Sequence, residues 1–253
     1  VVVGDHDASY HQFYGGLVSI YAGGDGNITS VPAQNLGGYE ETAKFGQTLA
    51  LGDFNGDGEI DLAVGSPEGM NYTGYVSVFE GLEDDFFDSE PSLILDADYE
   101  YDRLGSGMDS CDLNNDGYDD LIVGARNAED RSQSTIQGNQ GGLSIYMGSP
   151  SGLPSRADYY LWGPDKSFHL GESVTTGDFN DDGYCDVVGG TQYYKNGILD
   201  DEGAALLFFN DASGTLEDTA SLTFYGPGKV GYSLTAGDLD DDGYDDLVLG
   251  AWR

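Results

Sequence analysis

Basic side chains are scarce in this chain of 253 residues, where 9 lysines and arginines stand against 46 aspartates and glutamates. The resulting formal net charge of −37 repels nucleic acid and anionic membranes, so neither is expected as a partner. Apolar runs of about 18 residues are missing, so we expect no helix that inserts into a membrane. Heptad repeats and long amphipathic helix patterns are also missing, which argues against a helical protein.

Cysteine occurs only twice, at Cys111 and Cys185. Each stands beside or inside an acidic segment described below, so the two thiols could meet if those segments lie on one face of the fold. A disulfide needs a specific separation, which a sequence cannot show. Two interpretations therefore stay open: a disulfide, or two free, half-buried thiols.

Residues typical of catalytic sites are few. His6 and His11 lie near Asp5 and Asp7, a combination that a transition-metal or acid–base site could use, while His169 stands in another repeat. A solvated polar loop explains the first two histidines more simply. The motifs G-x-S-x-G, the phosphate-binding loop and C-x-x-C are absent. The sequence therefore favours a binding protein over an enzyme.

Glycine is abundant, with 40 residues, and aromatic residues make up 12% of the chain. This composition favours an all-β protein with many tight turns. The most informative feature is a nine-residue pattern, Asp-x-(Asn/Asp)-x-Asp-Gly-x-x-Asp, that occurs four times. We call its copies acidic loops 1 to 4, at residues 53–61, 112–120, 178–186 and 238–246.

Each acidic loop has the donor pattern of a calcium site. Side-chain oxygens at positions 1, 3, 5 and 9, with a backbone carbonyl at position 7, suit a hard cation that takes about six to eight oxygen ligands. The glycine at position 6 allows the sharp turn. The expected ligands are Asp53, Asn55, Asp57, Glu59 and Asp61; Asp112, Asn114, Asp116, Tyr118 and Asp120; Asp178, Asn180, Asp182, Tyr184 and Asp186; and Asp238, Asp240, Asp242, Tyr244 and Asp246, where Glu59 and the three tyrosines offer backbone carbonyls. Acidic loop 4 is the most negative, so we expect it to bind calcium most tightly.

The flanks of the acidic loops exclude an EF-hand, which needs a helix on each side and a bidentate glutamate at position 12. Position 12 is Val64, Val123, Gly189 or Leu249, inside short β-branched runs that are closed by glycine. Such runs are typical of buried strands. Each acidic loop is therefore expected to join two strands.

The first aspartates of the loops follow one another at steps of 59, 66 and 60 residues, so the chain is a repeat protein. Each repeat has a glycine seven residues before its loop, at Gly46, Gly105, Gly171 or Gly231. Third strands are expected from Gly16, Gly74, Gly141 and Gly203, and weaker fourth strands near Leu93, Tyr160 and Leu222. Four antiparallel strands per repeat are typical of a propeller blade.

Phe45-Gly46 and the segment AVGSP at 63–67 resemble the FG-GAP repeat. The later segments IVGAR, VGGTQ and VLGAW lack the proline, whereas the acidic loops match the family residue by residue. The resemblance covers essentially the whole chain. It implies the all-β, seven-bladed propeller found at the head of integrin α subunits and in many secreted microbial proteins, with calcium as a structural brace on the face away from the ligand.

On this interpretation residues 1–253 form one propeller, with repeats at approximately 1–44 (incomplete), 45–103, 104–169, 170–229 and 230–253 (incomplete). The chain opens and closes on a second strand, VVVG and LVLG, so a ring closed by these repeats alone would fill one strand position twice. We therefore expect about four blades of a seven-bladed ring. Alternatively, the unpaired strand adds to a blade of a neighbouring molecule.

In propellers the loops between strands two and three, and those between blades, usually form the partner-binding face. Here they include residues 4–14, 66–73, 125–140 and 191–202, and their polar, tyrosine-rich composition suits a protein or glycan ligand. Tyr10, Tyr14, Tyr72, Tyr193 and Tyr194 either contact that ligand or pack the loops on the blades, and Trp162 is expected to be packing. Asn27 and Asn71 begin N-x-T glycosylation sequons on expected loops.

The favoured function is an extracellular or cell-surface adhesion, protein-interaction or assembly module braced by about four calcium ions. Extracellular sites of this kind bind calcium at roughly 10⁻⁴–10⁻³ M, so cytosolic calcium would leave them empty. A carbohydrate-binding, lectin-like propeller is the alternative. A polysaccharide-cleaving enzyme is the weakest hypothesis, because it needs a basic residue in a cleft and the candidates are few: Arg103, Arg126, Arg131, Lys195 and Lys229.

Overall fold

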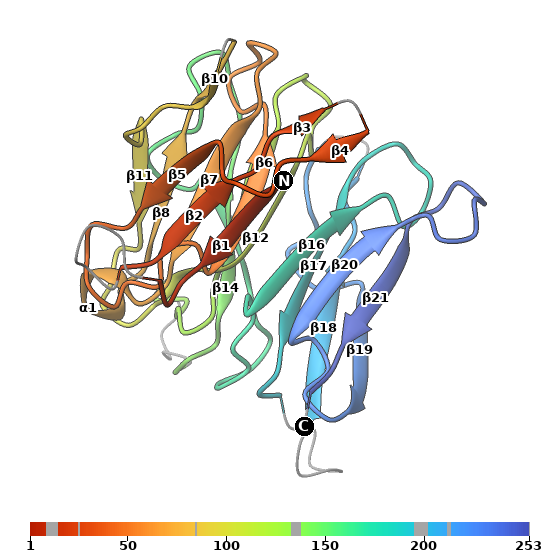
Figure 1. Ribbon diagram of the computed structural model, residues 1–253. Coiled ribbons are helices and arrows are strands. Elements are labelled where there is room, and N and C mark those ends of the chain that lie inside the picture. Colours follow the sequence, from red (N-terminus) through yellow and green to blue (C-terminus); the bar gives the residue numbers. More distant parts are fainter. Residues whose placement is uncertain are drawn as a thin grey trace.

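The computed structural model is a row of antiparallel sheets that follow one another in chain order (Figure 1). It describes residues 1–8, 15–24, 26–83, 85–132, 138–194, 202–211 and 214–252. Three sheets have four strands each, paired in order along the chain. They are blade 2, with β6 (Thr48–Gly52), β7 (Asp61–Ser66), β8 (Tyr75–Phe79) and β11 (Leu93–Asp96); blade 3, with β12 (Leu104–Cys111), β13 (Asp120–Ala125), β14 (Gly142–Tyr146) and β15 (Tyr159–Trp162); and blade 4, with β16 (Ser173–Gly177), β17 (Asp186–Thr191), β18 (Glu202–Phe208) and β19 (Leu222–Pro227).

The two ends of the described chain supply smaller sheets. Blade 1 consists of β1 (Val2–Asp5), β2 (Leu17–Ile20) and β5 (Gln34–Gly37), and blade 5 consists of β20 (Ser233–Gly237) and β21 (Asp246–Gly250). Two short hairpins, β3 (Gly23–Gly24) with β4 (Asn27–Ile28) and β9 (Gly81–Leu82) with β10 (Asp85–Phe87), extend from blades 1 and 2. These sheets confirm the prediction of an all-β propeller with four-stranded antiparallel blades.

The second strand of each full blade is buried along its whole length because another blade covers each of its faces. Successive side chains of β7 point to opposite sides: Leu62 and Val64 join the core shared with blade 1, and Ala63 joins the core shared with blade 3. In blade 4 the same alternation sends Val187 toward blade 3 and Val188 toward blade 5. The continuous apolar runs of the sequence therefore arise from burial on both faces.

Neighbouring blades approach so closely that glycines meet at the contact. A Cβ on Gly65, at the end of β7, would lie 2.6 Å from the carbonyl oxygen of Gly105 in blade 3. Gly105 itself has φ of +87°, which favours glycine. Equivalent contacts join Gly4 with Gly46, Gly124 with Gly171, and Gly190 with Gly231. The repeated glycine before each acidic loop thus serves the packing of one blade on the next.

Successive connections in an antiparallel sheet alternate between its two ends. The acidic loops join the first and second strands, so they share one end of the blades, which we call the acidic-loop face. The loops between second and third strands, and those between blades, lie on the opposite face. There the expected loop at 66–73 contains α1 (Gly69–Tyr72), a single turn in which Met70 and Asn71 have φ of 50° and 58°. No helix among the described residues is long and apolar enough to cross a membrane.

Candidate metal centres and ligand pocket

The first aspartate of each acidic loop organises the turn around its carboxylate. In loop 1, Oδ1 of Asp53 accepts hydrogen bonds from the N–H groups of Gly56 at 2.8 Å and Asp57 at 3.1 Å, and Oδ2 accepts one from Gly58 at 3.0 Å. The equivalent bonds from positions 5 and 6 reach Asp112, Asp178 and Asp238 at 2.8–3.1 Å. The four copies of the sequence pattern therefore form the same hydrogen bonds, and all four loops share one backbone conformation around this carboxylate.

Positions 3 and 5 extend the same arrangement. Asn55 Oδ1 accepts from the N–H of Asp57 at 2.9 Å, and Asp57 Oδ1 accepts from the N–H of Glu59 at 2.9 Å. Loops 2 and 3 repeat both contacts. The side-chain oxygens of positions 1, 3 and 5 are thereby held on the same short turn.

The aspartate at position 9 is set apart by its burial. Asp61, Asp120 and Asp186 are at most 2% exposed, although they begin strands. In acidic loop 2, Oδ2 of Asp120 accepts from the N–H of Leu113 at 2.9 Å. Oδ1 accepts from the N–H of Gly148, beyond the third strand, at 2.7 Å. The position-9 carboxylate therefore ties its own loop to the rest of the blade.

Burial raises the pKa of these carboxyl groups. Desolvation is the largest cause and raises the pKa of Asp120 to about 7 and that of Asp186 to about 6, with further increases from the carboxylates at positions 5 and 1. The pKa of Asp61 is raised for the same reasons. A cation within the loop would oppose this effect by compensating the clustered negative charge.

Acidic loop 4 gathers the densest charge. Its Asp238, Asp240 and Asp246 each offer a carboxylate oxygen, and these oxygens lie within 4.8 Å of one another. Repulsion from Asp242, and less strongly from Asp246 and Asp238, raises the pKa of the fully exposed Asp240. The donor set is entirely oxygen, which suits a hard divalent cation such as Ca²⁺.

Adjacent acidic loops are joined by residues that the ligand pattern did not single out. Asp119, at position 8 of loop 2, accepts from the backbone N–H of Asp53 at 2.8 Å and donates its own N–H to the Asp53 carbonyl at 3.0 Å. Asp245, at position 8 of loop 4, makes the same pair of contacts with Asp178, at 2.9 and 3.0 Å. The clue in the sequence was the Asp-Asp pair that ends loops 2 and 4.

On the opposite face, the described tyrosines pack against other rings. Tyr72 stacks on Tyr101 with ring centroids 6.2 Å apart, and the Arg103 guanidinium lies 4.9 Å from the centroid of the Tyr72 ring. Tyr193 contacts His169, and Tyr194 contacts Phe168 and Tyr225. These contacts support the packing interpretation for three of the five candidates. Tyr10, Tyr14, His11 and Lys195 lie outside the described residues.

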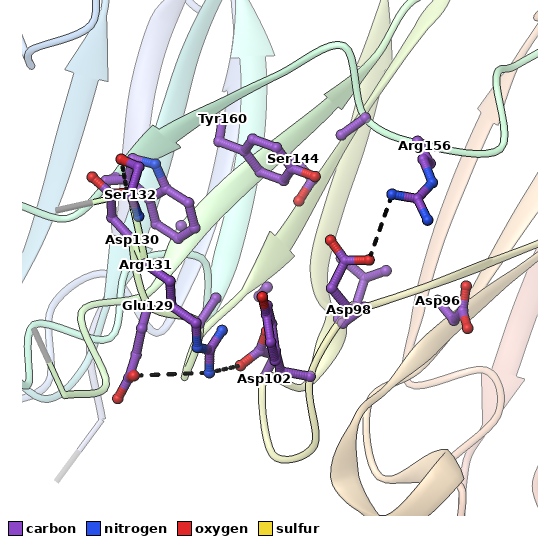
Figure 2. Close-up of a pocket in the computed structure, with 18 of the residues that line it drawn as sticks. Asp96, Asp98, Asp102, Glu129, Asp130, Arg131, Ser132, Ser144, Arg156 and Tyr160 are labelled. Atoms are coloured by element: carbon purple, nitrogen blue, oxygen red, sulfur yellow. Dashed lines mark hydrogen bonds and ion pairs between the residues drawn. The ribbon is translucent and has the colours of Figure 1, made fainter. Parts of the chain in front are cut away.

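A pocket of about 330 Å³ lies between blades 2 and 3 and extends along β14 and β15 from the opposite face toward the acidic-loop face (Figure 2). Its walls come from 96–104, 125–132 and 142–162. Tyr160 and Trp162 stack with centroids 5.5 Å apart, and Tyr160 is 43% exposed. Trp162 thus packs at the blade edge, as expected, and also lines a pocket that no single segment of sequence could reveal.

The pocket is lined by more acidic than basic residues, and contacts among its charged side chains hold them in place. Arg131 lies 3.4 Å from Asp102 and 3.8 Å from Glu129 (Figure 2). Its guanidinium stacks 3.7 Å from the centroid of the Tyr99 ring. Burial raises the pKa of Asp102, while the bond to Arg131 opposes the rise. Asp96 and Asp98 also line the pocket, and Asp98 lies 4.0 Å from the exposed Arg156.

The fold and the loops define a β-propeller in which consecutive blades carry the same acidic loop. The FG-GAP repeat model matches residues 45–79 and 104–146, and the FG-GAP-like repeat model matches 178–249. Integrin alpha-5 of Xenopus laevis is 28% identical over 217 residues, which cover 82% of this chain and 20% of that protein. Phosphatidylinositol-glycan-specific phospholipase D of Rattus norvegicus is 32% identical over 171 residues, covering 64% of this chain and 20% of that protein.

The chain therefore belongs to the FG-GAP repeat β-propellers and is integrin alpha-like, as the sequence resemblance indicated. It spans about a fifth of the length of the curated relatives it matches. Among solved structures, an exotype rhamnogalacturonan lyase, YesX, aligns at 15% identity and a TM-score of 0.48, covering 93% of this chain and 46% of that one.

Proposed function

We propose that this propeller is an extracellular or cell-surface interaction module whose blades are braced by calcium and whose opposite face binds a protein partner. The observation that carries the proposal is that the two faces of the propeller present different kinds of residue. Repeated carboxylate turns occupy one face, exposed aromatic rings lie on the other, and a pocket lies between blades 2 and 3. Similarity to integrin alpha subunits supports the same assignment.

Calcium would be held by the residues expected from the sequence: the side-chain oxygens at positions 1, 3, 5 and 9 of each acidic loop, and the carbonyls of Glu59, Tyr118, Tyr184 and Tyr244. Once bound, the ion would neutralise carboxylates that otherwise repel one another. The loop residues fix the turn between the first two strands of each blade. Asp119 and Asp245 connect their loops to the neighbouring loop by accepting hydrogen bonds from the N–H groups of Asp53 and Asp178.

A thermal melt with calcium, with magnesium and with excess chelator tests the brace. We expect calcium to raise the melting temperature well above the chelated value and magnesium to raise it much less, because magnesium requires a smaller octahedral site. Equal melting temperatures in all three conditions would rule out calcium sites in the acidic loops.

The partner-binding face is tested separately. The chain, loaded with calcium, is immobilised and exposed to a panel of extracellular-matrix proteins, next to a variant with Arg131→Ala and Tyr160→Ala. Binding that the double variant loses, while its melting temperature is kept, supports a protein ligand on the opposite face. Binding that the variant keeps would place the contact elsewhere.

A glycan ligand is the second candidate, and the stacked pair Tyr160 and Trp162 favours it, because sugar rings lie on aromatic faces. Hydroxyl and carboxylate groups at Ser144, Asp96 and Asp98 could accept bonds from sugar hydroxyls. The excess of carboxylates favours a neutral or amino sugar over an anionic one. On a glycan array, Tyr160→Ala should abolish binding; Tyr101→Ala, which disrupts a stacked pair outside the pocket, is the matched control.

A polysaccharide-cleaving enzyme is not proposed. Each candidate basic residue within the described part of the chain is already engaged. Arg103 pairs with Glu68, Arg126 with Glu172 and Arg131 with Asp102. Lys229 lies 4.2 Å from the centroid of the Trp252 ring.

Two further expectations belong to this proposal. Asn27 and Asn71 are both exposed, so a glycosylating cell that secretes the protein could modify them. The described chain also presents sheet edges at blades 1 and 5, which the rest of a longer ring or a second molecule would cover.

A further inference from the structure

Three interfaces join the four acidic loops, and two of them use the same contact. At the first, the Asp119 side chain lies against Gly52 and binds the N–H of Asp53. At the third, the Asp245 side chain lies against Gly177 and binds the N–H of Asp178. In both cases position 8 of one loop meets the residue that directly precedes the previous loop.

At the middle interface both partners are replaced by cysteine. Cys111 precedes acidic loop 2, where loops 1 and 3 have glycine, and Cys185 occupies position 8 of acidic loop 3, where loops 2 and 4 have aspartate. The repeat places these two positions together, and the structure agrees. Both cysteines are free, half-buried thiols in the structure, the Cys111 side chain interacts with that of Cys185, and both pack against the core shared by blades 3 and 4.

The two equivalent interfaces show how close this pair of positions is. A Cβ built on Gly52 would lie 2.9 Å from the Cβ of Asp119, and one built on Gly177 would lie 3.2 Å from the Cβ of Asp245. A disulfide requires a Cβ–Cβ separation of about 3.5–4.5 Å. Two cysteines at such positions therefore reach bonding geometry after a small widening, without any rearrangement of the blades.

The backbone around the two cysteines is fixed from both sides. Asn210 donates through Nδ2 to the carbonyl of Leu113 at 2.6 Å and to that of Cys185 at 3.1 Å. On the other side of Cys111, Thr176 donates its N–H to Asp109 Oδ2 at 2.8 Å. These bonds span blades 3 and 4, so the two thiols are held in register by contacts that do not depend on them.

We propose that Cys111 and Cys185 form an inter-blade disulfide in the oxidised protein, replacing the aspartate–backbone contact used at the other two interfaces. One thiolate attacks a sulfur of a disulfide oxidant such as glutathione disulfide, forming a mixed disulfide and releasing one thiolate. The second cysteine then attacks the mixed disulfide and releases the other. Two protons leave the cysteines, two electrons reduce the oxidant, and one S–S bond forms. Such a bond persists in an oxidising compartment, so this inference rests on the proposed extracellular location for its role in the cell, while its chemistry can be tested alone.

The bond would give the two central loops a link that does not need a metal. Aspartate–backbone contacts weaken when the loops lose calcium and open, whereas a covalent bond remains. The oxidised chain should therefore keep blades 3 and 4 together in chelator, and its melting temperature there should exceed that of the reduced chain by on the order of 5–10 °C.

The purified full chain is equilibrated with a reduced and oxidised glutathione mixture, quenched with N-ethylmaleimide and examined by intact mass and non-reducing peptide mapping. We expect loss of two hydrogens, no maleimide addition and a cross-linked peptide pair containing Cys111 and Cys185. Two maleimide adducts, a glutathione adduct on either cysteine, or a disulfide-linked dimer would each overturn the proposal. Cys111→Ser and Cys185→Ser should each leave the other thiol free for labelling.

Melting in chelator, before and after oxidation, tests the role of the bond, with the double variant Cys111→Ser, Cys185→Ser as the control that should not respond. An unchanged melting temperature in the cross-linked wild type would overturn the proposal that the disulfide stabilises the contact between blades 3 and 4. The calcium response of the reduced chain is read separately, so failure of the metal sites and failure of the disulfide give different results.

Discussion

Asp120 and Gly148 are joined by a 2.7 Å hydrogen bond, although they lie 28 positions apart in the chain. The donor is the Gly148 N–H, just beyond the third strand of blade 3, and the acceptor is the buried position-9 carboxylate of acidic loop 2. Gly81 and Asn210 donate to Asp61 and Asp186 in the same way, at 2.9 and 2.8 Å. The aspartate at position 9 therefore connects the acidic loop to the third strand of its blade.

This double role predicts the effect of Asp120→Asn. The amide would keep one acceptor oxygen and replace the other with an NH2 group, so the N–H of either Leu113 or Gly148 would face another donor and lose its acceptor. We expect a loss of about 1–3 kcal/mol in unfolding free energy, measured by denaturant titration in chelator so that calcium does not contribute. Asp246→Asn is the matched control, because Asp246 is exposed and its loss should cost much less. Equal losses in the two variants would contradict the assignment.

The charge of acidic loop 4 predicts a calcium affinity that depends on Asp240. Asp240→Asn removes one of three converging carboxylates and should weaken binding at this loop on the order of tenfold, or ~1.4 kcal/mol, by calorimetric titration. Asp241→Asn changes the net charge equally at a neighbouring position outside the ligand pattern. The second variant should bind calcium like the wild type; a matching loss there would show that net charge, and not ligation, sets the affinity.

The glycine contacts between blades predict that adding one methyl group at such a contact lowers the free energy of unfolding substantially. In Gly65→Ala the new Cβ would meet the Gly105 carbonyl oxygen at 2.6 Å and Thr48 Oγ1 even more closely, so the two blades must separate. We expect a loss of about 1–3 kcal/mol in unfolding free energy. Gly24→Ala is the control, since nothing lies within 4 Å of a Cβ at that position. A stable Gly65→Ala variant would mean that the blades are not packed at this point.

The acidic loops and the blades could be predicted because their signals are local and repeated. A ligand pattern of nine residues needs no tertiary information, and a strand buried on both faces is a continuous apolar run. The contacts of Asp119 and Asp245 could not be predicted from the ligand pattern, because that pattern gives position 8 no role. The burial of Asp120 depends on a third strand 28 positions away. The assignment of ligands and the division into repeats stay predictions.

The pocket was beyond sequence reasoning for a different reason. Its residues come from the connection between blades 2 and 3, from β14 and β15, and from the loops at 125–132 and 155–157, and they converge only when the blades pack. The local signal was the spacing of Tyr160 and Trp162, two residues apart, which puts both rings on one face of β15. Similarly, the two cysteines could be related only once the loops were known to lie side by side.

The environment of His169 predicts a pH dependence of stability. Burial lowers its pKa below the ordinary value of 6.5, and the charge of Arg126 lowers it further, while a hydrogen bond to the backbone of Arg126 and the charge of Glu172 oppose the shift. The neutral ring contacts Asn127 Oδ1 through Nδ1 at 3.0 Å and packs on Tyr193. A folded pKa below the unfolded one means that this stabilisation is complete above pH 6.5 and is lost as the pH falls through the folded pKa.

His169→Gln removes the titrating group and retains a polar side chain that can still reach Asn127. The unfolding free energy of the wild type should therefore fall more than that of the variant between pH 7 and about pH 5, both measured by denaturant titration in calcium-free buffer with chelator. Comparing the two chains is essential, because the raised pKa of Asp120 acts in the opposite direction: its protonated form is favoured in the folded state, so its contribution falls as pH rises. That contribution is common to both chains and cancels in the difference. Parallel pH curves would show that His169 has the same pKa in the folded and unfolded states, and that burial of its ring does not oppose its protonation.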